Sequence, residues 1–155
     1  FIIIIIHSGI LYAQYFGVPY FSKNKQVIKH KYYRLSYSEE HEQAYWVSYF
    51  LDGSKLPGKV SRTDDFRIDP NINTMSATLF DYKGSGYDRG HLVPAGDMGF
   101  SKVAMSESFY MSNMSPQNPS FNRGVWKRLE SLVIDFILPF ILIFIFFIFF
   151  IVYKC

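Results

Sequence analysis

Tyr87-Asp88-Arg89-Gly90-His91 is the stretch of sequence that decides the fold of this chain. Two further blocks follow it, Asn113-Met114-Ser115-Pro116-Gln117 and Asn122-Arg123-Gly124-Val125-Trp126-Lys127-Arg128-Leu129-Glu130. Together they place a histidine, arginines, amide side chains and a carboxylate close to one another along the chain. Groups of these kinds can activate a water molecule, hold a divalent cation and bind a phosphate. The three blocks are therefore the candidate functional part of the sequence.

The histidine block predicts a short strand over His91 to Val93, which Pro94 ends. On an extended chain Arg89 and His91 point to the same face, because side chains alternate along a strand. The cation beside the imidazole disfavours its charged form, and a neutral imidazole suits a general base. A histidine without such a neighbour is more often a surface or core residue. We expect Gly90 to permit a positive φ or a close approach to a ligand, and Asp88, on the opposite face, to be structural.

A helix is predicted after the Pro116–Pro119 loop, with Ser120 or Asn122 as its N-cap. One face of this helix follows the α-helical period and is expected to pack in the core through its apolar members: Asn122, Trp126, Leu129 and Val133. The neighbouring face carries charges of both signs and could border a site: Arg123, Lys127, Glu130 and Ile134. Asn122 either caps the helix or offers its amide oxygen to Mg²⁺. Glu130 either holds a metal-bound water or pairs with a basic residue of its own face.

The composition of the chain restricts which metal it can bind, but it leaves open whether its partner is nucleic acid. The 155 residues suffice for one domain with a core, and a net charge of +3 permits nucleic acid as a partner without requiring it. The single cysteine, Cys155, excludes an internal disulfide and a zinc site built on cysteines. A metal must then use oxygen or histidine ligands, which favours a hard cation such as Mg²⁺ or Mn²⁺. Gln43 to Leu51, rich in aromatic and β-branched residues, predicts a strand.

From about Gln43 to Val133 the chain closely resembles the DNA/RNA non-specific endonucleases, the endonuclease G-like nucleases with a ββα-metal (His-Me finger) site. The resemblance lies in four ordered blocks: Arg62-Thr63-Asp64-Asp65-Phe66-Arg67, Gly86 to His91, Asn113 to Gln117, and Asn122 to Glu130. It implies an α+β fold and a metal-dependent endonuclease that hydrolyses phosphodiester bonds in DNA and RNA.

The same resemblance assigns a role to each site residue. His91 is implied to be the general base, Asn122 the direct ligand of Mg²⁺, and Glu130 the residue that orients a metal-bound water. Arg89 is implied to contact the scissile phosphate, and Asn113 to support the site or the substrate. One position departs from the pattern, because Ile134 stands where the family usually has a phosphate-binding arginine. A truncated, catalytically inactive chain that at most binds nucleic acid is therefore the alternative function.

The resemblance stops after Asp135, where the family's domain usually continues. No charged residue occurs from Phe136 to Tyr153, and three interpretations stay open for this apolar, helix-forming tail. As a helix it would span about 27 Å, close to the ~30 Å of a bilayer's hydrocarbon, which suits a membrane anchor. It could instead be a buried core helix, or an artefact that replaces the true C-terminal part of the domain.

The chain is thus predicted to have three parts. Residues 1–21 are interpreted as the remnant of a signal peptide and its following segment, with cleavage after Ala13, or else as a buried strand. Residues 22–135 form the N-terminal part of the endonuclease domain, and residues 136–155 form the apolar tail. The predicted location is secreted or periplasmic, with a membrane-anchored protein as the alternative.

Overall fold

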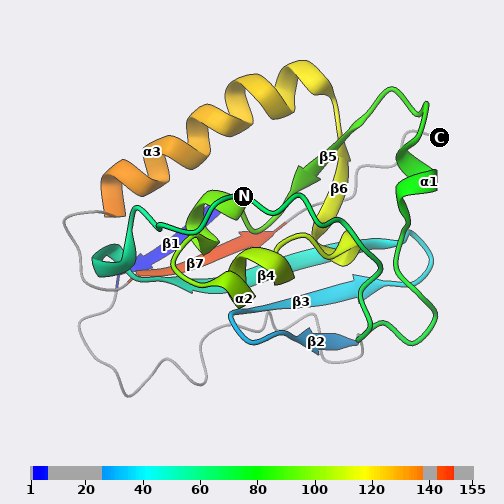
Figure 1. Cartoon of the computed structure of the whole chain (residues 1–155), viewed down its shortest axis with the longest axis horizontal. Coiled ribbons are helices and arrows are strands. Elements are labelled where there is room, and N and C mark those ends of the chain that lie inside the picture. Colours follow the sequence, from blue (N-terminus) through cyan, green and yellow to red (C-terminus); the bar gives the residue numbers. More distant parts are fainter. Residues whose placement is uncertain (1, 7–25, 138–142, 149–155) are drawn as a thin grey trace.

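The computed structural model describes residues 2–6, 26–137 and 143–148 of the chain, and it is drawn in Figure 1. Its main element is a five-stranded antiparallel sheet, which has the strand order β1-β7-β4-β3-β2. The bounds of these strands are Ile2–Ile6 (β1), Val27–Lys29 (β2), Tyr33–Ser38 (β3), Gln43–Leu51 (β4) and Ile143–Ile148 (β7). The strand predicted over Gln43 to Leu51 is confirmed with these same bounds.

The apolar tail contributes a strand instead of the predicted helix. β7 lies between β4 and β1, so that Phe147 is in register with Val47 of β4 on one side and with Ile2 of β1 on the other. A run that is apolar on every side fits a strand inside a sheet as well as a buried helix, and Ile and Phe favour the strand. The helix prediction is therefore wrong for Ile143–Ile148. β1 likewise agrees with the strand alternative for Ile2–Ile6, whereas the proposed cleavage point at Ala13 lies outside the described residues.

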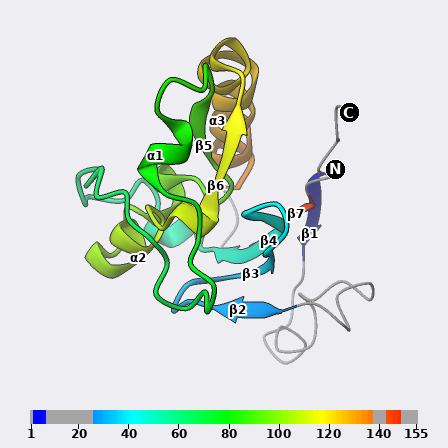
Figure 2. The same cartoon turned by 90° about the vertical axis from the view of Figure 1, so that its right-hand side faces the viewer.

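A second, smaller unit carries the three sequence blocks. β5 (Asp88–His91) pairs antiparallel with β6 (Met114–Gln117), and β6 leads into η6 (Phe121–Trp126) and α3 (Lys127–Ile137). This order of two strands and a helix is the predicted ββα arrangement. The predicted short strand is shifted toward the N-terminus, because it ends at His91 instead of beginning there. Figure 2 shows the ribbon of β5 and β6 and the helix α3 on one side of the main sheet.

Short helical segments connect these units. They are η3 (Gly53–Lys55), α1 (Leu79–Tyr82), η4 (Ala95–Met98), α2 (Lys102–Glu107) and η5 (Met111–Asn113). Thr78 and Asp81 form a capping box at α1. The Asp81 carboxylate accepts a hydrogen bond from the backbone N–H of Thr78, and the Thr78 hydroxyl accepts one from the backbone N–H of Phe80. Ser101 caps α2 by accepting a hydrogen bond from the backbone N–H of Ala104.

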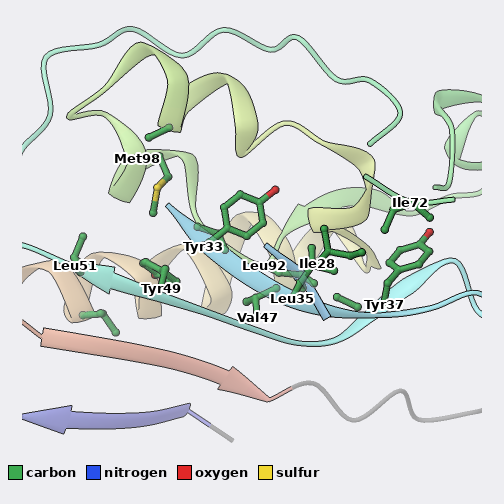
Figure 3. Packing of buried hydrophobic residues seen from close by; sticks show 14 of the residues in the cluster. Ile28, Tyr33, Leu35, Tyr37, Val47, Tyr49, Leu51, Ile72, Leu92 and Met98 are labelled. Carbon is green, nitrogen blue, oxygen red and sulfur yellow. The ribbon is translucent and has the colours of Figure 1, made fainter. Parts of the chain in front are cut away.

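The core joins the main sheet to the ββα unit. Leu35, Val47 and Tyr49 of the sheet share one buried cluster with Leu92 and Met98, which follow β5, as Figure 3 shows. Trp126 and Val133 belong to the same cluster, and Leu129 packs against it, which confirms the predicted apolar face of the helix. Burying a side chain of this size contributes about 1.5–3 kcal/mol. The packing therefore fixes the helix over the sheet and holds its polar face toward the residues after β5.

Within the parts of the chain that the structure describes, no helix combines the length and the apolar character needed to cross a bilayer.

Candidate active site

The β5–β6 ribbon positions both His91 and Arg89. The two side chains leave the same face of β5, as predicted, and both contact the ring of Phe66. The guanidinium carbon of Arg89 lies 4.1 Å from the centre of that ring, and the imidazole packs edge-on at 5.8 Å between ring centres. Phe66 therefore keeps a cation and an imidazole side by side.

Gly90 serves the ribbon and not a ligand. Its φ is not positive, and a Cβ atom at this position would lie 2.1 Å from the side-chain Cδ of Gln117. Gln117 is the partner of Asp88 across the ribbon, so the side chain of β6 fills the space above Gly90. The predicted ligand approach at Gly90 is therefore wrong, and the glycine is needed for close packing between the two strands.

His91 is buried and its Nε2 atom has no hydrogen-bond partner among the described residues. The ring of Phe109 packs edge-on against the imidazole at 4.9 Å between ring centres, next to the ring of Phe66, which it also contacts. Burial lowers the pKa of His91 to about 3; Arg62 lowers it further, Asp64 opposes this, and Arg89 adds the smallest effect, a further lowering. The predicted effect of Arg89 is present, but burial and Arg62 act more strongly. His91 is thus a neutral imidazole whose Nε2 atom makes no hydrogen bond to the part of the chain that the structure describes.

Asn122 lies in the first part of the helix, which is a π-helix over Phe121–Trp126. It does not cap the helix: the N-cap is Ser120, and the side chain of Ser120 makes no capping bond either. The Nδ2 group of Asn122 donates to Oδ2 of Asp88 at 3.0 Å. Because the amide nitrogen is used in this way, the amide oxygen remains as the group that can accept a cation or a water.

Asp88 is the structural residue that the sequence predicted. Its carboxylate receives two hydrogen bonds from Arg123, at 2.8 and 2.6 Å, as well as the bond from Asn122. These bonds from Arg123 and Asn122 hold the pKa of Asp88 below its usual value. Asp88 thereby fixes the start of the helix to β5, and Arg123 forms its ion pair with Asp88 and not with Glu130.

One cavity of about 560 Å³ is lined by three of the predicted site residues, His91, Asn122 and Glu130, and we call it the His91 cavity. The second face of the helix lines it as predicted, with Arg123, Lys127, Glu130 and Ile134. The remaining lining residues are Arg62, His91, Pro94, Ala95, Gly96, Asp97, Asn122 and Ser131. The structure therefore brings His91, Asn122 and Glu130 to one solvent-filled space from three separate positions in the sequence.

Two carboxyl groups on this cavity have raised pKa values. Burial raises the pKa of Glu130 to about 7, and the neighbouring Asp97 raises it further, against opposing effects of Trp126, Arg62 and Lys127. Burial also raises the pKa of Asp97 to about 7, against the hydrogen bond from the Tyr49 hydroxyl. Only one oxygen of Asp97 receives that bond. The other, Oδ1, is buried and has no hydrogen-bond partner among the described residues.

Asp97 and Arg62 were not predicted as site residues. Asp97 lies in a turn, and its contact with Tyr49 of β4 is made only in the folded chain. No local sequence pattern therefore identifies Asp97 as a site residue. Arg62 was part of a block that carried the family resemblance, and this was the one signal that could have identified it. Its guanidinium pairs with Asp64, where Nε lies 2.6 Å from Oδ1, and stacks over Phe109 at 4.8 Å from the ring centre.

Two predicted site residues lie away from the His91 cavity. Arg89 is exposed and lines a neighbouring cavity. Asn113 is fully buried, and its amide group accepts from the backbone N–H of Val93 at 2.9 Å and donates to the carbonyls of Val93 and Ser108. Asn113 thus holds the chain just after His91 in place. Of the two alternatives, support of the site or of the substrate, these bonds favour the first.

The lining of the His91 cavity fits a hard divalent cation. It offers an amide oxygen from Asn122, the carboxyl group of Glu130 and the unpaired oxygen of Asp97. Oxygen groups of this kind suit Mg²⁺ or Mn²⁺, which keep several waters and take few protein ligands. Among the described residues no three His, Cys, Asp or Glu side chains cluster as a ligand set, so a metal here would be held mainly through water.

The order of two strands and a helix defines a fold class, that of the ββα-metal nucleases. The chain belongs to the DNA/RNA non-specific endonuclease family, whose family model matches residues 13–138. This confirms the resemblance and the α+β fold class that were predicted from the sequence.

Named relatives give the comparison its detail. Nuclease EXOG, mitochondrial, from Xenopus laevis is 44% identical over 113 residues, which cover 72% of this chain and 31% of that protein. Endonuclease G, mitochondrial, from Homo sapiens is 41% identical over 100 residues, which cover 63% of this chain and 34% of that protein. A solved structure, "Crystal structure of the EndoG/EndoGI complex: Mechanism of EndoG inhibition", superposes with a TM-score of 0.70 and 31% identity, covering 77% of this chain and 51% of the other. The chain thus spans about a third of these two curated relatives.

The predicted location is corrected by the same comparisons. The sequence favoured a secreted or periplasmic protein, or a membrane-anchored one, but both curated relatives above carry a mitochondrial name. No helix among residues 26–137 could serve as the anchor, and part of the tail is a strand of the sheet. Part of the short apolar start that suggested a signal peptide forms β1 (Ile2–Ile6). A run of isoleucine is also typical of a strand.

Proposed function

We propose that this chain carries the catalytic centre of a metal-dependent endonuclease that hydrolyses phosphodiester bonds in DNA and RNA. One observation carries the proposal: a buried neutral histidine with an unused Nε2 atom faces the same cavity as the Asn122 amide and the Glu130 carboxyl group. Membership of the DNA/RNA non-specific endonuclease family supports the same reaction.

His91 is the general base of the proposed reaction. Its neutral imidazole takes a proton from the attacking water through Nε2, while the water oxygen forms a bond to phosphorus and the leaving oxygen of the sugar departs. In the free protein burial holds the pKa of His91 at about 3. A phosphodiester that enters the cavity brings negative charge next to the ring, which favours the protonated form and raises the pKa toward the working range. His91 therefore becomes a stronger base when substrate is present.

The positive groups around the cavity stabilise the charge that develops on the phosphoryl oxygens. Arg62 and Lys127 line the His91 cavity itself. Arg89 stands next to His91 on the same face of β5, held by Phe66, and we assign it to the scissile phosphate. These contacts address phosphate and not base edges, so cleavage is expected to show little sequence preference.

The metal in this proposal is Mg²⁺, with Mn²⁺ as a substitute. The amide oxygen of Asn122 would be its direct protein ligand, and Glu130 would accept hydrogen bonds from its water molecules. When bound, a divalent cation neutralises charge on the phosphate and on the leaving oxygen. Asn113 keeps the chain after His91 in place through its bonds to Val93 and Ser108.

The test is nicking of supercoiled plasmid DNA and cleavage of a labelled RNA by the 155-residue chain, with Mg²⁺ and with excess chelator. We expect cleavage of both substrates with Mg²⁺ and none with chelator. His91→Ala is expected to lower kcat on the order of 10²- to 10⁴-fold, the usual contribution of a general base. His41→Ala is the matched control, because His41 is not among the residues that line the His91 cavity. Equal rates for wild type and His91→Ala would exclude the proposed mechanism.

A second candidate function is binding of nucleic acid without cleavage. Ile134 favours it, because this apolar side chain lines the His91 cavity where the family resemblance implies an arginine. In that case DNA binding would weaken steeply with salt, as phosphate contacts do, and no cleavage would follow when Mg²⁺ or Mn²⁺ is supplied.

A further inference from the structure

A second cavity of about 480 Å³ opens beside the His91 cavity, and we call it the Tyr87 cavity. It is formed by α1 and its C-cap, by β5 with the residue before it, and by the helix η6. Its lining residues are Leu79, Tyr82, Lys83, Tyr87, Asp88, Arg89 and Arg123. Its volume lies within the ~300–1,000 Å³ that is usual for small-ligand sites.

Apolar and aromatic surface is exposed at this cavity. Tyr87 is 54% exposed and Leu79 is 47% exposed, although both are large side chains that a protein core would accept. Gly84 and Gly86 have φ values of +74° and +81°, so the loop before Tyr87 turns in a way that other residues rarely adopt. The loop thus presents the Tyr87 ring beside the cavity and does not bury it. An exposed aromatic ring in a concave site marks a binding surface.

The charge around the cavity is positive. Lys83 and Arg89 are exposed, and neither forms an ion pair with another described residue. The one carboxylate of the lining, Asp88, is neutralised by two hydrogen bonds from Arg123 and one from Asn122. An anionic ligand would therefore meet two available cations and no unpaired negative charge.

The two cavities share a wall. Arg123 lines both of them, and Asp88 of the Tyr87 cavity bonds directly to Asn122 of the His91 cavity. Arg89 and His91 stand two positions apart on β5, one at each cavity. A nucleic acid strand whose phosphate is bound at His91 and Arg89 would thus place a neighbouring nucleotide at the Tyr87 cavity.

We propose that the Tyr87 cavity binds an unpaired base of the nucleic acid strand next to the phosphate that is cleaved. The base stacks on the ring of Tyr87 against Leu79, Lys83 holds the next phosphate along the strand, and Arg89 stays at the scissile phosphate. Stacking on an aromatic ring accepts any base, which agrees with cleavage that does not depend on sequence. A paired base could not enter, so the site favours single-stranded or locally opened substrates. This inference rests on the proposed function.

The experiment compares two fluorescent oligonucleotides of equal length, one of thymidines and one of abasic residues with the same phosphates. Affinity is measured by fluorescence anisotropy with the full chain in the His91→Ala background, so that cleavage does not interfere. Tyr87→Ala is expected to weaken binding of the thymidine oligonucleotide on the order of tenfold, in line with the loss of one stacked base. Binding of the abasic oligonucleotide is expected to stay unchanged, and Tyr87→Phe is expected to behave like the parent.

Phe80→Ala is the matched control. Phe80 is 81% exposed on α1, whose Leu79 and Tyr82 line the cavity, but it does not line the cavity itself, and its removal should leave both affinities unchanged. The proposal is overturned if Tyr87→Ala weakens both oligonucleotides equally, or neither. The two proposals can fail separately. If the chain cleaves DNA but Tyr87→Ala leaves both affinities unaltered, only the proposed base site is rejected. A chain that neither cleaves nor binds any oligonucleotide loses both.

Discussion

Two buried polar clusters in this molecule are built in opposite ways. At the first, Nε2 of His30 lies 2.9 Å from Oδ2 of Asp69, and the carboxylate also accepts from Ser112 and from the backbone N–H of Asn71. We call these residues the His30–Asp69 cluster. At the second, the His91 cavity, the Nε2 atom of His91 and the Oδ1 atom of Asp97 are equally buried but have no partner among the described residues.

The pairing decides how each cluster responds to burial. Burial alone raises the pKa of Asp69, but the hydrogen bonds from His30 and Ser112 outweigh it, and the net pKa is lowered. At Asp97 burial is opposed only by Tyr49, and the pKa rises to about 7. Buried polar groups that are fully paired contribute to stability, whereas unpaired ones cost free energy. Burial of a histidine or an aspartate therefore does not by itself mark a site, but burial without a partner does.

The comparison is tested most strongly by the same substitution at the two histidines. His30→Leu leaves the buried Asp69 carboxylate without one of its hydrogen-bond partners, which should lower the free energy of unfolding by about 1–3 kcal/mol. His91→Leu replaces an imidazole that packs beside two phenyl rings, with no hydrogen bond at Nε2, by an apolar side chain. It should leave the free energy of unfolding unchanged or raise it, while cleavage is lost. Urea unfolding followed by circular dichroism gives both values.

An equal loss of stability in both variants would show that His91 is also held by interactions of its own. The contrast between the two clusters would then not stand.

The second test is the dependence of stability on pH at Asp97. A carboxyl group with a folded pKa of about 7 binds a proton between pH 4 and 7 that the unfolded chain has already released. By linkage, its contribution to the free energy of unfolding falls as pH rises through this window, by at most about 1.4 kcal/mol for each pH unit. Asp97→Asn should remove this fall, so the variant should gain on the wild type from pH 4 to pH 7.

Asp69 gives the opposite arm of that experiment. Its folded pKa is lowered, so its contribution is complete above the unfolded pKa near 4 and is lost as pH falls toward the folded value. Asp69→Asn should therefore lose most relative to the wild type at neutral pH and least in acid. The comparison fails if the two variants differ from the wild type with the same sign of slope.

The ββα unit could be predicted from the sequence because its parts are local. Arg89 and His91 are two residues apart on one strand, and the helical period of the sequence predicts both the apolar and the polar face of the helix. It was the family resemblance, and not the helical period, that grouped Asn122 with His91 and Glu130, and all three line one cavity. The roles assigned to them stay proposals.

The main sheet and the rest of the site could not be predicted in this way. β7 pairs with β4 and β1 across most of the chain, and its apolar residues satisfy the pattern of a helix as well as that of a central strand. Asp97 gains its burial only when Tyr49 packs over it. Arg62 reaches the cavity through the contact of its own segment with Phe109. Each of these depends on tertiary contacts that a local pattern does not contain.

The smallest expected effect concerns Ile134, which lines the His91 cavity without contributing charge. Ile134→Arg would place a guanidinium on the helix face that already carries Lys127 and Glu130, one turn beyond Glu130. A hydrogen bond to a charged group contributes about 1.5–3 kcal/mol, so kcat/KM for plasmid nicking should rise on the order of tenfold. Ile134→Met, which keeps the size without the charge, should leave it unchanged. The residues of the His30–Asp69 cluster do not line the His91 cavity, so their contribution to the free energy of unfolding should be the same in both variants. A rise in both variants would assign the effect to packing of the helix, whereas a rise in the arginine variant alone shows that the cavity binds phosphate and still lacks one cation for it.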